Sequence, residues 1–208
     1  MIKALLLIFE PIATWERIRR TPRSLAFILL SFLIPIALLN SLVEGYGLVT
    51  WGKWQSDVGR TKMFTRGESI VFEALQFVLA LLIVMIGAKL MKSLGETFHG
   101  RHTYTQAFAT VTYGLSPLFL CRLLDGLPNV SPWATWAIGI LLSIAVLYQG
   151  VPRMMEPDPP HAFGLYLMSS LLLFLITGLA RFVTAWYLQG RFVKLETLIS
   201  DVSKRLPF

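Results

Sequence analysis

Residues 69–91 read SIVFEALQFVLALLIVMIGAKLM, and this stretch decides the fold class. It is long enough to cross a hydrocarbon core of about 30 Å as an α-helix, which takes about 20 mostly apolar residues. Four further apolar runs follow the same pattern, at residues 24–49, 104–121, 133–149 and 161–187. The sequence therefore predicts an all-α, polytopic membrane protein with five transmembrane helices.

The composition supports this class. Apolar residues make up 55% of the 208 residues and charged residues 15%, whereas soluble domains have about 45–50% and about 25%. A soluble, disordered or fibrous protein is therefore not expected. Lys and Arg outnumber Asp and Glu by 19 to 12. We attribute this excess to basic residues that flank spans and meet anionic headgroups, and we expect no nucleic-acid partner.

The segments outside the spans are amphipathic or polar. Residues 1–23 place apolar residues at helical spacing beside Arg17, Arg19, Arg20 and Arg23, which predicts an N-terminal amphipathic surface helix. Residues 50–68 are expected to form a polar loop, and residues 188–208 an amphipathic C-terminal tail. Pro35 and Pro117 fall inside spans, where they should kink or interrupt the helix.

Charge alone does not orient the chain. Five spans put the two termini on opposite sides, and the Lys and Arg residues other than Arg181, which lies inside a span, divide into nine on each side. The first span has five basic residues before it and four after it, which is a weak indication that the N-terminus is inside.

Ionisable residues collect at the membrane face opposite the N-terminus. Arg181 is expected about 9 Å deep, six residues from the end of its span. Because buried charges usually pair or face water, we expect Arg181 to pair with Glu73 or Glu44 and to line a polar pocket. Gln76 should share the helix face of Glu73. In the alternative, Arg181 reaches the headgroups alone. The full set at this face is Glu44, Glu73, Gln76, Arg122, Asp125 and Arg181.

Motifs for chemistry are weak. His99 and His102 are three residues apart, but zinc needs three or four ligands and no metalloenzyme signature is present, so we expect no metal. Ser116 has no histidine predicted on its side of the membrane, which argues against a serine hydrolase. We expect no cofactor and no catalysis. Thr135, Gly139 and Ser143 recur every four residues, a pattern typical of close helix packing, within the chain or in a homo-oligomer.

Three short motifs carry a family resemblance. They are FHGRHTYTQA (residues 98–107), TYGLSP (112–117) and LYQGVPRMM (147–155). Their glycine, tyrosine and proline positions resemble the Yip family, membrane proteins first known as partners of Ypt and Rab GTPases. The residues that match are Gly100, Tyr104, Tyr113, Pro117, Tyr148 and Gly150. The resemblance implies five spans and a cytoplasmic N-terminus, and it carries over no catalytic residue.

The short segment before the first span is similar to that of bacterial family members, so we expect a multi-pass protein of the bacterial cytoplasmic membrane without a Rab partner. The expected role is a scaffold that contacts the lipid bilayer and a membrane or cytoplasmic protein. The alternative is a small-solute or ion transporter that uses Glu73 and Arg181 beside the break at Pro117, because interrupted helices often line substrate sites.

Overall fold

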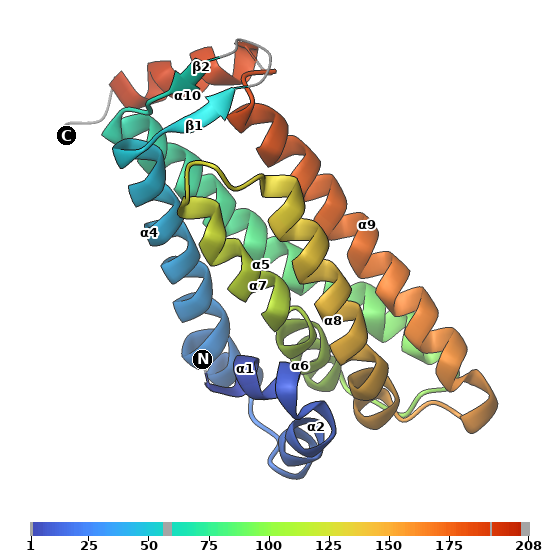
Figure 1. The fold of residues 1–208 in the computed structure, drawn as a ribbon. Helices are drawn as coiled ribbons and strands as arrows, with labels where there is room; N and C mark the ends of the chain where they lie inside the picture. Colours follow the sequence, from blue (N-terminus) through green and yellow to red (C-terminus); the bar gives the residue numbers. More distant parts are fainter. Residues whose placement is uncertain (1, 56–59, 192, 205–208) are drawn as a thin grey trace.

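The structure is a computed structural model that describes residues 2–55, 60–191 and 193–204. Within them, the helical segments long and apolar enough to cross a membrane are Leu25–Thr50, Arg66–Thr97, Tyr104–Gly126, Pro132–Met155 and Pro159–Leu188. The predicted all-α fold with five spans is confirmed. The spans run side by side as one elongated bundle (Figure 1).

Two spans are interrupted where the sequence places proline. The first consists of α3 (Leu25–Ile28), a π-helical turn η1 (Leu29–Leu33) and α4 (Ile34–Thr50). The π-turn comes just before Pro35, and the Ile34 N–H there reaches back to the Leu29 carbonyl. The third span consists of α6 (Tyr104–Gly114), α7 (Ser116–Arg122) and the 3₁₀ turn η2 (Leu123–Gly126). Since proline has no N–H to donate, both breaks follow from the sequence.

The remaining spans are regular. They are α5 (Arg66–Thr97), α8 (Pro132–Met155) and α9 (Ala162–Leu188), the last preceded by the 3₁₀ turn η3 (Pro159–His161). Thr65 caps α5 in a reciprocal bond pattern with Glu68, and Thr103 caps α6 in the same way with Gln106. The third span is the centre of the bundle, because 72% of its most apolar window is buried, against 28–44% for the others.

The two ends of the bundle differ. We call N-terminal end the one formed by α1 (Ile2–Phe9), α2 (Pro11–Arg20) and residues 98–103 and 156–161. We call hairpin end the opposite one, formed by η2, β1 (Lys53–Gln55), β2 (Arg60–Lys62) and α10 (Val193–Lys204) (Figure 1). The two strands pair antiparallel, with Lys53 opposite Lys62. The sequence predicted only a loop at this hairpin.

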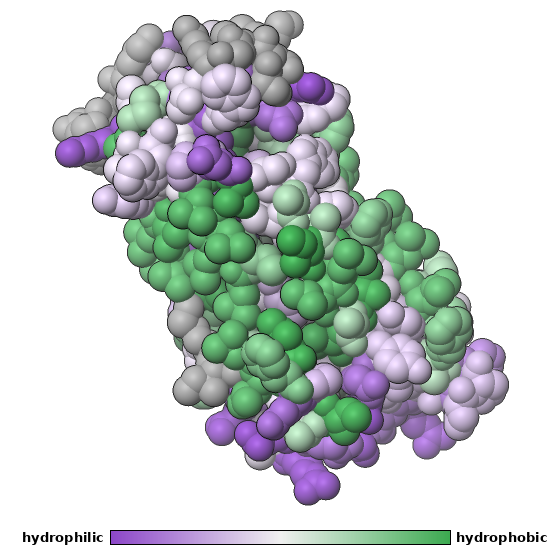
Figure 2. Space-filling view, in the orientation of Figure 1, coloured by the Kyte–Doolittle hydropathy of each residue, from purple (hydrophilic) through white to green (hydrophobic). Residues whose placement is uncertain are grey.

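The surface has the polarity of a membrane protein. On the face that Figure 2 shows, a hydrophobic band covers the middle of the bundle and hydrophilic residues gather at both ends. Leu30, Leu141 and Leu179 are each about two-thirds exposed in this band, while Asn40, Thr112 and Ser143 are fully buried. In lipid, exposed leucine is favourable and a polar side chain needs a partner inside the protein.

The N-terminal segment packs into the bundle. It forms two helices that meet at Glu10 and Pro11, rather than one. Trp15 is fully buried, and its Nε1 donates a hydrogen bond to the Val146 carbonyl of α8 at 3.1 Å. Ala4 and Leu7 of α1 are also fully buried in the main core. The segment is therefore anchored to α8 through a specific side chain, as well as being amphipathic.

Candidate functional site

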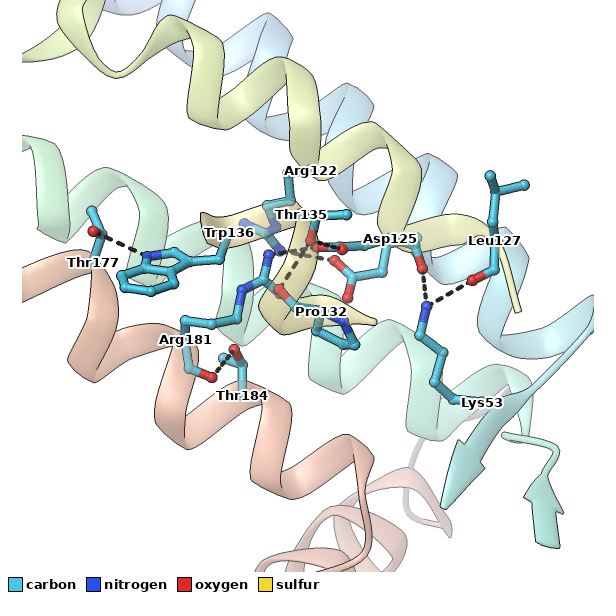
Figure 3. Close-up of polar contacts among 11 residues, drawn as sticks. Lys53, Arg122, Asp125, Leu127, Pro132, Thr135, Trp136, Thr177, Arg181 and Thr184 are labelled. Carbon is cyan, nitrogen blue, oxygen red and sulfur yellow. Dashed lines mark hydrogen bonds and ion pairs between the residues drawn. The ribbon is translucent and has the colours of Figure 1, made fainter. Parts of the chain in front are cut away.

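The hairpin end contains a buried carboxylate that several elements contact. Asp125 in η2 is 1% exposed. Its Oδ2 accepts a bond from Arg181 Nη2 of α9 at 2.6 Å, and its Oδ1 accepts one from Thr135 Oγ1 of α8 at 2.5 Å. Lys53 Nζ of β1 donates to the main-chain carbonyls of Asp125 and Leu127 (Figure 3). Asp125 therefore joins the end of the third span to the fourth span, the fifth span and the hairpin.

Two glycines allow η2 to reach this position. A Cβ atom at Gly47 of α4 would overlap the main-chain oxygen of Gly126, and one at Gly126 would lie 2.7 Å from the Val43 oxygen. The two backbones therefore touch, and any side chain at either position would separate them. This contact holds the turn under the bundle and directs Asp125 inward.

A second ion pair joins the first and third spans. Arg122 Nη2 of α7 lies 3.1 Å from Glu44 Oε2 of α4, and the Glu44 side chain is fully buried. The predicted pairing of Arg181 with Glu73 or Glu44 is therefore wrong, because Arg181 pairs with Asp125. The alternative, in which Arg181 reaches the headgroups alone, is also wrong, since its side chain is only 5% exposed. The cause is the η2 turn, which folds Asp125 back into the bundle.

Arg181 and Gln76 line a small cavity between α5, α7, α8 and α9. It has about 510 Å³ of empty space, counting the part open to the surroundings, and its walls are mostly apolar. It has room for only a few water molecules. Gln76 Nε2 and Arg181 Nη1 are buried and have no hydrogen-bond partner among the described residues. Glu44 and Glu73, which we predicted in the same pocket, are not among its lining residues.

Glu73 lies instead between α4 and α5. Its Cγ would be 3.1 Å from a Cβ placed on Gly45, and both its carboxylate oxygens lack a hydrogen-bond partner in the described part of the chain. It borders an apolar groove of about 1170 Å³ of open and enclosed space along the membrane-facing side of α4 and α5. Glu73 and Arg181 therefore belong to different places in the bundle.

Lys53 is the unexpected member of the hairpin-end cluster. It lies outside the spans, yet it is only 4% exposed. Burial lowers the pKa of its ammonium group below the ordinary lysine value, and Arg181 adds repulsion. The carboxylates of Asp125 and Glu44 oppose this effect. The sequence placed Lys53 in a solvated loop, and only the hairpin brings it over η2.

The small-residue stripe of α8 faces α7. Ser143 Oγ accepts a hydrogen bond from the Leu118 N–H at 3.3 Å. A Cβ atom added to Gly139 would lie only 2.8 Å from the Leu118 Cα, so the two helices are in close contact there. Thr135 continues the stripe to Asp125. The stripe thus packs two consecutive spans of one chain against each other.

At the N-terminal end, two of the motif residues contact the docked helices. A Cβ on Gly150 would overlap the indole ring of Trp15. The Tyr113 ring packs on Phe32 with centroids 4.9 Å apart, and Lys3 Nζ lies 5.6 Å from the Tyr113 centroid. Residues of the third and fourth spans, as the structure bounds them, therefore form the surface that receives α1 and α2.

The other motif residues fix the neighbouring loops and helix starts. Gly100 donates its N–H to the Gly95 carbonyl at 2.8 Å, and the Tyr104 hydroxyl bonds the Met85 carbonyl at 3.4 Å. Tyr148 packs edge-on against Tyr166, with centroids 5.2 Å apart. Pro117 lies in the first turn of α7.

A family model described as the Yip1 domain matches residues 5–181. The chain belongs to the Yip1 domain family. Searches of curated proteins and of solved structures found no match. The matched region of the Yip1 domain begins in α1 and ends at Arg181, so it contains Trp15, Gly150 and both ion pairs of the hairpin end. Together with the five apolar spans, this makes the chain a multi-pass membrane protein.

Sequence reasoning on this Yip1 domain missed two anchors. Asp125 was placed at the correct face but not paired, because its partner lies 56 residues away in the sequence. Trp15 was interpreted as part of an apolar helix face, although a glycine 135 residues later provides the space for its ring.

In the described part of the chain, no three His, Cys, Asp or Glu side chains come together in a group that could hold a metal ion. The His99 and His161 rings pack against each other with centroids 5.7 Å apart.

Proposed function

We propose that this Yip1 domain protein is a non-enzymatic scaffold of a bacterial cytoplasmic membrane. In the orientation that the family resemblance implies, the N-terminal end faces the cytoplasm. There the docked helices α1 and α2, with residues 98–103 and 156–161, form the surface that binds a membrane or cytoplasmic protein partner or organises the surrounding bilayer.

One observation carries this proposal: the insertion of Trp15 against Gly150 in a seat built from family-type positions. An amphipathic segment that served only to float on lipid would need no such seat. Anchoring α2 to α8 fixes its exposed face relative to the spans, and a preorganised face lowers the entropy cost of binding a partner. The bundle interior agrees with a scaffold, since the Thr135–Ser143 stripe packs α8 on α7.

The seat can be filled without touching the exposed face. Gly150→Leu places a side chain where the indole lies, and it should displace α2 while the five spans stay folded. Ala145→Leu is the matched control, because Ala145 is an exposed residue of the same helix. Crosslinked partners and membrane morphology on overexpression would be compared for both variants. We expect Gly150→Leu, but not Ala145→Leu, to lose the crosslinked partners and the change in membrane morphology that overexpression of the wild type causes. Unchanged partners and morphology in a variant whose α2 has become protease-sensitive would contradict the proposal.

A second candidate, transport of a small solute or ion, is favoured by the unpartnered Gln76 Nε2 and Arg181 Nη1 beside one cavity. Transport requires water to reach these donors. A cysteine at Gln76 in a Cys121→Ala background would be probed with a membrane-impermeant thiol reagent, with Ile138→Cys as a lipid-facing control and Thr61→Cys as an exposed one at the hairpin end. Labelling of Gln76→Cys at the rate of Thr61→Cys would favour transport over the scaffold.

A further inference from the structure

A basic pocket opens at the N-terminal end, where α1, α2 and the turn at residues 21–24 meet α6. Its polar lining includes Lys3, Arg19, Arg23, Thr21 and Tyr113, and it has about 450 Å³ of empty space, including the part open to solvent. No acidic side chain is among its lining residues. A pocket that combines three cations with hydroxyl groups and contains no carboxylate favours a negatively charged ligand.

Two of the three cations of this pocket, Lys3 and Arg23, have no ion-pair partner within the described chain. Arg19 has a partner, Glu156, at 3.2 Å, with both side chains about half exposed. Lys3 and Arg23 contact aromatic rings instead. Lys3 Nζ lies 5.6 Å from the Tyr113 centroid, and Arg23 Cζ lies 4.8 Å from the Phe27 centroid. No described carboxylate lies within ion-pair distance of either, and an aromatic face attracts a cation without cancelling its charge.

The pKa of Lys3 is affected by its burial and by the neighbouring positive charges. Burial lowers the pKa of its ammonium group below the ordinary lysine value, and the nearby charges of Arg23 and Arg17 lower it further. Such repulsion is relieved when an anion binds among the cations. The charged groups at the hairpin end show the opposite arrangement, because each buried arginine there has its own carboxylate.

The pocket also has a defined level in the bundle. Thr21, Pro22 and Arg23 form the connection just before Leu25, where the first span begins. The pocket therefore lies beside the start of a span, which is the level of lipid headgroups. Arginine forks and lysine ammonium groups bind phosphate oxygens through charge-assisted hydrogen bonds.

We propose that the pocket between Lys3, Arg19 and Arg23 binds a phosphate group, supplied by the headgroup of an anionic membrane lipid. The proposal goes beyond the scaffold function, since a lipid can occupy this pocket whether or not the protein gathers partners. A bound headgroup would join α1, the turn before the first span and α6 through one ligand.

The test uses the full chain purified in detergent and titrated with short-chain phosphatidylglycerol, phosphatidylcholine or inorganic phosphate. The wild type should bind phosphatidylglycerol more tightly than phosphatidylcholine. Lys3→Gln/Arg23→Gln should weaken phosphatidylglycerol binding by about tenfold or more, since it removes two charge-assisted contacts. Arg66→Gln/Lys89→Gln removes the same charge from exposed positions outside the pocket, and it should change binding by less than about twofold.

A conservative variant keeps the test independent of folding. Lys3→Arg retains the charge and should bind phosphatidylglycerol as the wild type does. An equal loss in the pocket and control variants would overturn the proposal, because net charge alone would then explain binding. Saturable binding of inorganic phosphate that depends on Lys3 and Arg23, with no preference for phosphatidylglycerol, would overturn the lipid as the source of the phosphate group.

Discussion

Arg181→Met is the perturbation that tests the hairpin-end cluster most directly. It removes the partner of Asp125 at 2.6 Å and leaves the carboxylate buried with a single hydroxyl donor, Thr135. Removing one member of a buried ion pair costs about 3–5 kcal/mol because the other charge stays uncompensated. For a chain of this length, about 2–4 °C per kcal/mol gives a fall of about 6–20 °C in the melting temperature.

Thermal unfolding in detergent, followed by size-exclusion recovery or circular dichroism, measures this effect. Arg181→Met/Asp125→Asn removes both charges and should regain most of the loss, since no isolated charge remains. Lys92→Met is the control. It breaks an exposed pair with Glu96 at 3.2 Å, which should cost less than about 1 kcal/mol. The reasoning would be refuted if Arg181→Met cost no more stability than Lys92→Met. It would also be refuted if the loss in the double variant equalled the sum of the losses in Arg181→Met and Asp125→Asn alone, because the two residues would then not stabilise each other.

Three further variants test the same end of the bundle. Gly47→Ala should destabilise by about 1–3 kcal/mol, because its Cβ meets the Gly126 backbone, whereas Gly45→Ala meets only movable side chains and should be near neutral in the same melting assay. Thr135→Val should cost about 1–3 kcal/mol by leaving Asp125 Oδ1 without its donor, and Thr135→Ser should retain most of the stability. Burial lowers the folded-state pKa of Lys53, so between that value and the unfolded value of about 10.4 the unfolded chain binds more protons. The stability of the wild type relative to Lys53→Met should therefore rise with pH in that window, and a flat or falling difference would contradict the burial of Lys53.

The fold was predictable because membrane spans depend on local composition. Each long apolar run predicts a helix, because a helix satisfies its own backbone hydrogen bonds in lipid. The breaks at Pro35 and Pro117 were also predictable, because the missing N–H of a proline interrupts helix hydrogen bonding at its own position in the sequence. The hairpin at β1 and β2 was not, because strands of three residues carry almost no periodic signal.

The pairing inside the bundle could be predicted only in part. Sequence reasoning placed Glu44, Asp125 and Arg181 at one face, because depth follows from position along a span. It paired them wrongly, because pairing depends on how helices are rotated and on the η2 turn, which the Gly47–Gly126 contact creates. Neither glycine stands out in the sequence, because each is needed only where the backbone of the other approaches it.

The two ends of the bundle handle positive charge in opposite ways. At the hairpin end, Arg122 and Arg181 are almost fully buried and each has a carboxylate within 3.1 Å. At the N-terminal end, Lys3 and Arg23 line a pocket and each lies over an aromatic ring, with no carboxylate of the described residues at ion-pair distance. A buried cation must find its counter-charge inside the protein, because lipid supplies none at that depth. A cation at headgroup level can take its counter-charge from the membrane. The two ion pairs of the hairpin end therefore need no bound anion, whereas the charges of Lys3 and Arg23 are the ones that the proposed lipid headgroup would balance.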